Sequence, residues 1–232
     1  MGLLQKLLDL VYPPRCVYCG GLLDHASPDP CHRCQKHLPW TEGEAGLQKG
    51  KYFTFCLSPG WYEGDLRASL LRYKFAGHPE YAQAYAQVLA QEIRKRWSGQ
   101  FDLISWIPVS QETLRRRGYD QARLLAEETA TVLGLNAVPT LQKIAVNARQ
   151  STLEDRESRK QNVQGVYAAL EPEALPGQRI LLIDDIITTG STLEEGAKTL
   201  LAAGANQVLA ATFCRVRPLA NTQRAKIFRE QG

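Results

Sequence analysis

The sequence lacks three features that would each define a class of protein. It has no apolar run near the roughly 20 residues needed to cross a bilayer, and it has no internal repeat or low-complexity tract. It also lacks a strong charge of either sign, because 28 Lys and Arg residues against 24 Asp and Glu residues give a formal net charge of +4. These absences argue against a membrane-spanning helix and a repeat array, and the mild charge does not by itself establish a nucleic-acid partner.

The N-terminus lacks the marks of a secretory signal. Its Leu-rich start, MGLLQKLLDLVYPPRC, has no basic leading segment and no small-residue cleavage site. Its apolar residues follow helical spacing: Leu3, Leu4, Leu7, Leu8 and Val11. This spacing predicts a short amphipathic helix that is stopped by Pro13 and Pro14. We therefore expect a cytoplasmic protein.

Cysteine is scarce outside one short stretch, CVYCGGLLDHASPDPCHRCQ. Four of the six cysteines form two C-x-x-C pairs there: Cys16, Cys19, Cys31 and Cys34. Each pair presents two thiolates from one tight turn, and two such turns complete a tetrahedral sulfur cage for Zn²⁺. The alternatives are disulfides, which a cytoplasmic protein seldom keeps, and a redox motif, which normally occurs once. Because the protein supplies all four ligands, the predicted zinc is structural.

Basic and aromatic residues surround these cysteines: Arg15, Tyr18, Arg33, Lys36 and Trp40. Cations can hold the phosphates of a single strand, and aromatic rings can stack on its bases. The same residues would serve equally well as a solvated rim around the metal module. The sequence leaves both interpretations open.

Residues 50–217 alternate between strand patterns and helix patterns. The expected strands are 52–58, 101–109, 179–184 and 207–213. The expected helices are 64–77, 79–97, 118–134 and 191–204. The alternation predicts an α/β domain in which helices cover both faces of a parallel sheet. A zinc module with the amphipathic helix in residues 1–45 would precede this domain, and a basic tail in residues 218–232 would follow it.

The most informative stretch is ILLIDDIITTGSTLEEG, residues 180–196. Its apolar start matches a buried strand, and ligands bind beyond the carboxyl ends of strands in parallel sheets. A turn follows whose N–H groups and hydroxyls suit a phosphate monoester: Thr188, Thr189, Gly190, Ser191 and Thr192. The turn is not a Walker loop, because it lacks that motif's second glycine and its lysine.

Asp184 and Asp185 stand directly before this turn. Two anions would repel a ligand made only of phosphate, but they can accept hydrogen bonds from a diol. A ribose 5-phosphate has both parts, so the residues predict a sugar-phosphate site. The alternative is an acid pair that holds Mg²⁺, as in phosphotransfer sites.

This stretch resembles the phosphoribosyl pyrophosphate (PRPP) motif of type I phosphoribosyltransferases, in which an apolar strand, two acids and two variable residues precede Thr-Thr-Gly-Ser-Thr. Nearly all of residues 1–217 further resemble the ComF competence-protein family. The segments that carry the resemblance are the four cysteines, WYEGDLRASLLRYKFAG, IPVSQETLRRRGYDQARLLA, an Arg-rich segment that closes on Arg159 and Asn162, and the PRPP motif. Asp120 departs from the Asn that is usual in the family's R-G-x-N-Q.

The resemblance implies a type I phosphoribosyltransferase-like fold and a role for each candidate residue. Asp184 and Asp185 would hold the ribose hydroxyls, the turn at 188–192 would hold the 5-phosphate, and Mg²⁺ would enter with PRPP. Residues that follow the second expected strand lie where the fold places its pyrophosphate loop: Ser110, Arg115 and Arg117. Residues of the polar segment 147–165 match the fold's mobile hood: Arg149, Arg156 and Arg159. The alternative is that these arginines belong to a solvated helix start and an exposed loop.

Three functions remain open. The ComF resemblance implies a DNA-uptake factor for natural transformation, which binds PRPP and acts with single-stranded DNA and its helicase. The PRPP motif also fits an active phosphoribosyltransferase of nucleotide salvage, in which a nitrogen nucleophile displaces pyrophosphate at the anomeric carbon. The third is a binding protein whose zinc module carries the function and whose PRPP site is regulatory.

Overall fold

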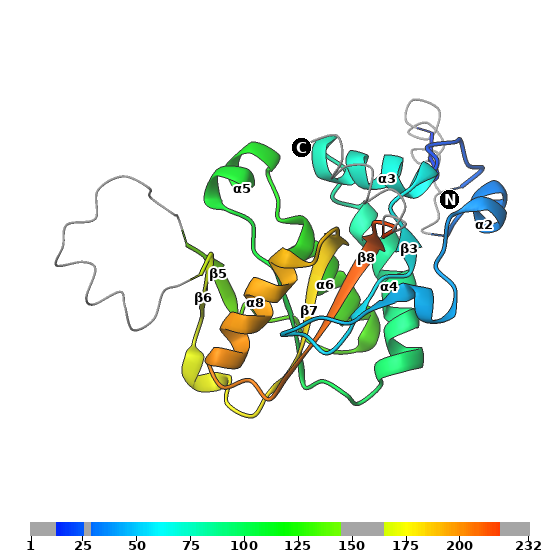
Figure 1. The fold of residues 1–232 in the computed structure, drawn as a ribbon. Coiled ribbons are helices and arrows are strands. Elements are labelled where there is room, and N and C mark those ends of the chain that lie inside the picture. The colour runs from blue at the N-terminus through cyan, green and yellow to red at the C-terminus, as the bar shows by residue number, and fades with distance from the viewer. Residues whose placement is uncertain (1–12, 26–28, 145–164, 219–232) are drawn as a thin grey trace, which may run out of the picture.

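The structure is a computed structural model that describes residues 13–25, 29–144 and 165–218. Its main sheet has six strands in the order β1-β2-β8-β7-β4, with β3 also paired to β8 (Figure 1). The strands are β1 (Leu47–Gln48), β2 (Cys56–Leu57), β3 (Gly60–Trp61), β4 (Leu103–Trp106), β7 (Arg179–Ile187) and β8 (Gln207–Arg215). All pairs are parallel except that of β1 with β2, so the predicted parallel sheet is confirmed, with one antiparallel edge strand.

Helices cover both faces of this sheet, as predicted. The helices of the α/β region are α3 (Gly64–Phe75), α4 (Tyr81–Trp97), α5 (Gln111–Arg117), α6 (Gln121–Leu133) and α8 (Ser191–Ala202). Helices α4 and α6 pack on one face and α8 on the other, while α3 and α5 lie near the carboxyl ends of β7 and β8 (Figure 1). None of the described helices is long and apolar enough to cross a membrane.

The central strand β7 shows why its apolar pattern is continuous rather than alternating. Leu181 and Ile183 pack into the core beneath α4 and α6, whereas Ile180 and Leu182 pack into a second core beneath α8. Successive side chains of a strand point to opposite faces, so a strand covered on both faces needs apolar residues at every position. The helix expected at 118–134 is α6, which ends as predicted at Gly134, where the backbone adopts a left-handed conformation with φ of 73°.

The expected strand at 52–58 is much shorter than predicted. Only Cys56 and Leu57 form the strand β2, and residues 51–54 are bends. The physical reason is a competing partner, because the Glu194 carboxylate accepts the N–H groups of Lys51 and Tyr52 at 2.7 and 2.8 Å. These two N–H groups are therefore not available to a strand, and hydrogen bonding to β8 begins at Thr54, whose N–H donates to the Val208 carbonyl at 2.9 Å.

A second, two-stranded antiparallel sheet pairs β5 (Leu141–Lys143) with β6 (Tyr167–Ala169). Several predictions fall outside the described residues: the helix at Leu3 to Val11, the arginines Arg149, Arg156 and Arg159, and the tail from residue 219. The remaining short helices are α2 (His32–His37), η1 (Gly43–Gly46) and η2 (Pro172–Ala174).

The cysteine stretch packs directly on the α/β domain. Cys16, Tyr18 and Cys34 belong to the same buried cluster as Tyr85 of α4 and Phe213 of β8. The Ser69 hydroxyl of α3 also donates a hydrogen bond of 2.6 Å to a carbonyl of this stretch. The metal module is therefore part of the core rather than an appendage on a linker.

Candidate functional site

The carboxyl ends of β4 and β7 meet at one edge of the sheet because the strands are parallel. Trp106, the last residue of β4, pairs with Ile183 of β7. The Ile107 N–H donates to the Ile183 carbonyl at 2.9 Å, so the segment after β4 begins beside Asp184. The structure therefore brings the predicted acid pair next to the segment that we expected to form the pyrophosphate loop.

The two acids project from opposite faces of β7, as strand alternation requires. Asp185 is 7% exposed, and its Oδ1 lies 2.8 Å from Lys74 Nζ of α3. Asp184 is partly exposed, and its Oδ1 accepts a hydrogen bond of 2.8 Å from the Asp185 N–H. Burial and then the charge of Asp184 raise the pKa of Tyr167, whereas burial and then the charge of Asp185 raise the pKa of Tyr73.

Negative charge is concentrated in this region. Burial, followed by the charge of Asp185, raises the pKa of Asp184, while the Lys74 ammonium lowers it. Burial also raises the pKa of Asp120, and the charge of Asp185 adds to that rise. A ligand that brings hydroxyl donors or a cation suits these carboxylates better than a bare anion does.

The turn after β7 forms the N-terminus of α8. Thr188, Thr189, Ser191 and Thr192 are all exposed there, and the Thr189 and Ser191 hydroxyl oxygens lie 3.1 Å apart. Gly190 is the N-cap, with φ of 88° and no side chain to accept the free N–H groups of the first turn. The predicted phosphate turn is thus an exposed group of hydroxyls and N–H donors at a helix N-terminus.

The three residues expected around the pyrophosphate loop differ in how accessible they are. Ser110 is the N-cap of α5, and its Oγ accepts a hydrogen bond of 3.2 Å from the Thr113 N–H. Arg117 donates to Gln121 Oε1 at 2.8 Å and is only partly exposed. Arg115 is exposed at the surface of α5. Ser110 and Arg117 therefore each have a local structural contact.

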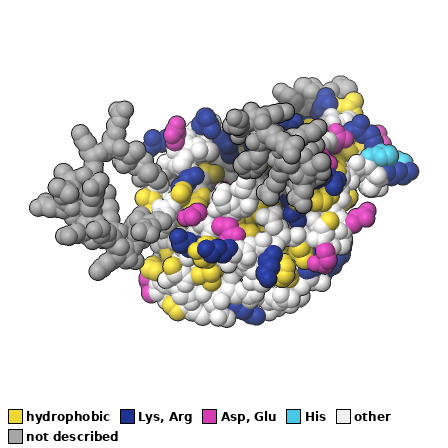
Figure 2. Space-filling view, in the orientation of Figure 1, with side chains coloured by type: hydrophobic (Ala, Val, Ile, Leu, Met, Phe, Trp, Pro, Cys, Tyr) yellow, Lys and Arg dark blue, Asp and Glu magenta, His cyan; other side chains and the backbone are white. Residues whose placement is uncertain are grey.

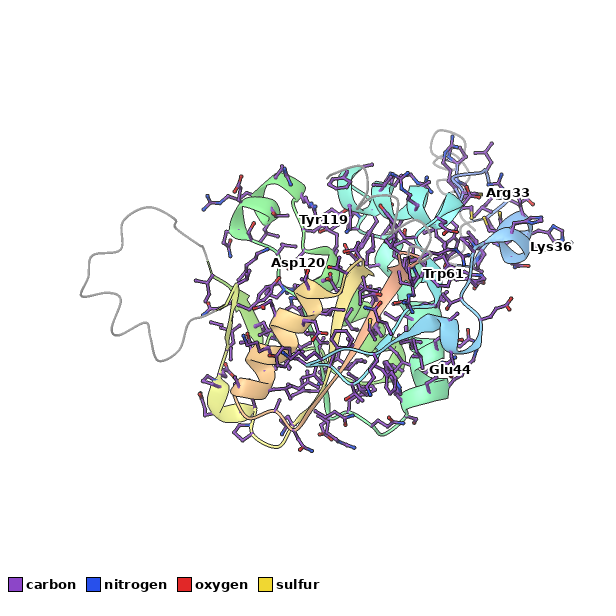
Figure 3. The ribbon with its side chains drawn as sticks, in the orientation of Figure 1. Arg33, Lys36, Glu44, Trp61, Tyr119 and Asp120 are labelled. Carbon is purple, nitrogen blue, oxygen red and sulfur yellow. The ribbon has the colours of Figure 1, made fainter. Side chains whose placement is uncertain are left out.

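Asp120 has a role that the sequence left open. Its Oδ2 accepts a hydrogen bond of 3.1 Å from the Val109 N–H, and its Oδ1 accepts one of 3.1 Å from the Arg123 N–H. The first bond holds the loop after β4 and the second caps α6, and Figure 3 shows Asp120 beside Tyr119 in this connection. An Asn side chain has one acceptor oxygen, so Asp can serve both N–H groups with separate oxygens.

A cavity of about 590 Å³ opens beside the same loop. Its polar and aromatic lining comes from the end of β4, from α6 and its preceding turn, and from β5: Trp106, Tyr119, Asp120, Arg123 and Lys143. The Arg123 guanidinium lies 5.9 Å from the centre of the Trp106 ring. The cavity has the size of a site for a small organic molecule.

The four clustered cysteines come together as predicted. Cys16 Sγ lies 3.9 Å from Cys34 Sγ, and Cys19 Sγ lies 3.7 Å from Cys31 Sγ. All four sulfur atoms lie within 4.8 Å of one another. A tetrahedron with Zn–S bonds of about 2.3 Å has S–S edges of about 3.8 Å, so this sulfur cage fits zinc.

The expected nucleic-acid surface of the metal module is only partly present. Tyr18 is fully buried and packs edge-on against Trp40 at 6.0 Å between ring centroids, so it belongs neither to a base-stacking surface nor to a solvated rim. Arg33 and Lys36 are exposed on the outer side of the module, among the basic side chains at that end of the molecule (Figures 2 and 3). Arg33 pairs with Asp65 at 2.7 Å.

Sequence reasoning missed two basic residues of α3. Lys74 pairs with Asp185, and one Arg72 nitrogen donates to the carbonyl oxygens of Val17 and Tyr18 at 3.0 and 2.9 Å. Both residues lie in LLRYKFAG, which belongs to a segment that carries the family resemblance. Because Lys and Arg on a helix are mostly exposed, nothing in the local pattern distinguishes these two.

Two parts of the chain match known domain families. Residues 120–229 match the phosphoribosyl transferase domain, and residues 7–55 match the double zinc ribbon domain. The second match and the sulfur geometry together identify the four cysteines as a structural zinc site. The first match includes the acid pair, the phosphate turn and Asp120.

Several curated proteins are similar over most of the chain. Competence protein F of Haemophilus influenzae is 28% identical over 218 residues, which cover 84% of this chain and 93% of that protein. The DNA utilization protein YhgH of Salmonella typhimurium is 32% identical over 206 residues, which cover 86% of this chain and 83% of that protein. Competence protein ComFC of Streptococcus pneumoniae is 29% identical over 211 residues, which cover 87% of each chain.

Proposed function

Because the chain belongs to the ComF competence-protein family and carries a phosphoribosyl transferase domain, we propose that it binds PRPP and acts on incoming DNA during natural transformation. Two of the relatives are named for competence and the third for DNA utilization. The zinc ribbon, packed into the core, gives this function a rigid scaffold.

The observation that carries the ligand proposal is the acid pair beside the phosphate turn at the carboxyl end of β7. The exposed hydroxyls and N–H groups at 188–192 suit the 5-phosphate, and Asp184 and Asp185 suit the ribose hydroxyls. The diphosphate would extend toward Ser110 and Arg115, after β4. Mg²⁺ bound to the diphosphate would offset the negative charge of the carboxylates.

Single-stranded DNA and the helicase that handles it are the proposed macromolecular partners. The exposed side chains of Arg33 and Lys36 offer positive charge for phosphates at the zinc end of the molecule. We place this activity in the cytoplasm, because four thiolates held for zinc suit a reducing compartment better than an oxidising one.

A transformation assay tests the proposal. In a naturally competent host, the gene for this chain would replace the host's own family member, as wild type, as Asp185→Asn, or as the control Lys198→Met, which changes an exposed residue of α8. We expect the wild type and the control to restore transformation and Asp185→Asn to fail at equal protein level. Full restoration by Asp185→Asn would show that the sugar-phosphate site is dispensable and would favour the zinc module as the seat of function.

Catalysis in nucleotide salvage is the second candidate, and the cavity of about 590 Å³ beside the loop after β4 favours it. Such a cavity could hold an acceptor base whose nitrogen forms a bond to the anomeric carbon of PRPP while the bond to pyrophosphate breaks. PRPP-dependent release of pyrophosphate with purines, pyrimidines and orotate tests this candidate. If every base is inert, the candidate is excluded.

A further inference from the structure

Three consecutive residues near the end of α3 contact three separate parts of the protein. Arg72 donates to two carbonyl oxygens of the zinc ribbon at 3.0 and 2.9 Å. The Tyr73 hydroxyl donates to the Gln121 carbonyl at the start of α6, at 2.7 Å. Lys74 forms the 2.8 Å ion pair with Asp185. The end of α3 thus connects the metal module, the helix after the pyrophosphate loop and the acid pair.

The Lys74–Asp185 pair is shielded from solvent. The Lys74 side chain is 19% exposed and the Asp185 side chain is 10% exposed, so solvent and salt screen this pair far less than the surface pairs. Removing one partner of such a pair leaves the other charge buried and uncompensated. The charge and the orientation of the Asp185 carboxylate are therefore matched by Lys74.

Two other acids lie near Asp185. Its negative charge adds to the rise that burial causes in the pKa of Asp184 and of Asp120. Among the described residues, Asp185 is the one of these three acids that forms an ion pair, and its partner is Lys74. A carboxylate accepts hydrogen bonds at both oxygens, so Asp185 can face Lys74 with Oδ1 and a ligand hydroxyl with its second oxygen.

The backbone around Lys74 is held by contacts of the two residues before it, which limits where its side chain can reach. The Tyr119 hydroxyl donates a hydrogen bond to the Tyr73 carbonyl, while the Tyr73 side chain is fully buried. Arg72 is anchored to the zinc ribbon on the other side. A flexible lysine held in this way can orient a carboxylate without large motions of its own backbone.

We propose that Lys74 is a positioning residue of the sugar-phosphate site, which holds the Asp185 carboxylate in the orientation that accepts hydrogen bonds from the ribose hydroxyls. This inference rests on the proposed function, because it assumes that a ribose phosphate occupies the site. Lys74 acts on the recognition of the hydroxyls and not on the phosphate, which binds at the turn after β7. Because Arg72 is hydrogen-bonded to the zinc ribbon, the ribbon also helps to hold the end of α3, which carries Lys74.

Calorimetric titrations with ribose 5-phosphate and 2-deoxyribose 5-phosphate test the inference, because the two ligands share the phosphate and differ in one hydroxyl. The variants are Lys74→Met, which removes the charge, Lys74→Arg, which keeps it, and the control Lys198→Met on the surface of α8. Lys74→Gln serves as a second neutral variant if the methionine lowers the thermal stability.

We expect the wild type and the control to prefer ribose 5-phosphate by about tenfold, the usual effect of one hydrogen bond to a charged group. The neutral variants should lose most of this preference while binding the deoxy ligand almost as before, and Lys74→Arg should restore part of it. Neutral variants that keep the wild-type preference would overturn the inference. So would neutral variants that lose affinity equally for both ligands, if Lys74→Arg does not restore it. A wild-type protein that binds neither ligand would overturn the proposed function first, and this inference with it.

Discussion

Tyr18 joins the zinc ribbon to the core of the α/β domain, so its removal should destabilise both parts together. The residue lies between Cys16 and Cys19 in the first cysteine pair and is 0% exposed. Its ring packs against Trp40 and Tyr85, with centroid distances of 6.0 and 6.2 Å. Its hydroxyl donates to a carbonyl of α4 at 3.4 Å.

The size of the effect follows from this burial. An aromatic side chain buries about 150–250 Å². At about 25 cal/mol per Å², this burial stabilises the folded protein by at most about 4–6 kcal/mol. Replacements of buried aromatic residues by alanine cost about 3–5 kcal/mol. We therefore expect Tyr18→Ala to lower the free energy of unfolding by about 3–5 kcal/mol. Tyr18→Phe keeps the ring and loses one long hydrogen bond, so it should cost less than about 1.5 kcal/mol.

Denaturant unfolding measures this effect when the helical circular dichroism signal and zinc release to a colorimetric chelator are followed together. We expect the two transitions to coincide in the wild type and in Tyr18→Phe, and both to move to lower denaturant in Tyr18→Ala. A Tyr18→Ala protein whose free energy of unfolding lies within about 1 kcal/mol of the wild type would refute the reasoning. Early zinc release with an unchanged helical transition would show that the ribbon unfolds on its own.

Three further substitutions test the acid pair and its surroundings. Gly190→Ala places a Cβ at φ of 88° and 3.3 Å from Gln48 Nε2, so we expect a loss of about 1–2 kcal/mol in thermal unfolding and weaker binding of ribose 5-phosphate. Asp120→Asn keeps the acceptor that caps α6 but leaves the Val109 N–H without its acceptor, so we expect a loss of about 1–3 kcal/mol in thermal unfolding. The substitution also removes a negative charge near Asp185, so PRPP should bind at least as tightly in calorimetry, and a tenfold weaker affinity would contradict this. Burial and Asp185 raise the folded-state pKa of Asp184 above its ordinary value of 3.8, so the free protein loses stability as the pH rises from 3.8 through that raised pKa. Asp184→Asn should therefore be more stable than the wild type above this window and equal to it below, and thermal unfolding that shows the same difference at every pH would contradict the assignment.

Much of the fold could be predicted because its determinants are local. The apolar run of β7 and the start of α8 are contiguous in the sequence, and α6 has a capping residue before it and Gly134 after it. The strand β2 could not be predicted at its true length, because Glu194, far along the chain, takes two N–H groups of the segment before it. The residues around β2 do not indicate a hydrogen-bond partner that is so distant in the sequence.

The same distinction applies to the candidate site. Asp184 and Asp185 can be proposed from the sequence because they lie next to the predicted phosphate turn in one short motif. Lys74 was missed because its partner Asp185 is distant in the sequence, and an exposed and a buried lysine look alike on a helix. The burial of Tyr18 could not be predicted for a similar reason, since an aromatic residue between two zinc ligands has the same local pattern whether it faces the core or the solvent.

The central claim is that a sugar phosphate binds at the acid pair and the turn after β7. Calorimetric titration of the zinc-loaded protein with PRPP and Mg²⁺ tests it most directly, with Asp184→Ala as the site variant and Lys198→Met as the control. The account predicts saturable binding at one site per chain, retained in the control and lost in Asp184→Ala. A wild-type protein that does not bind PRPP, or an Asp184→Ala protein that binds it as tightly as the wild type, would contradict the account.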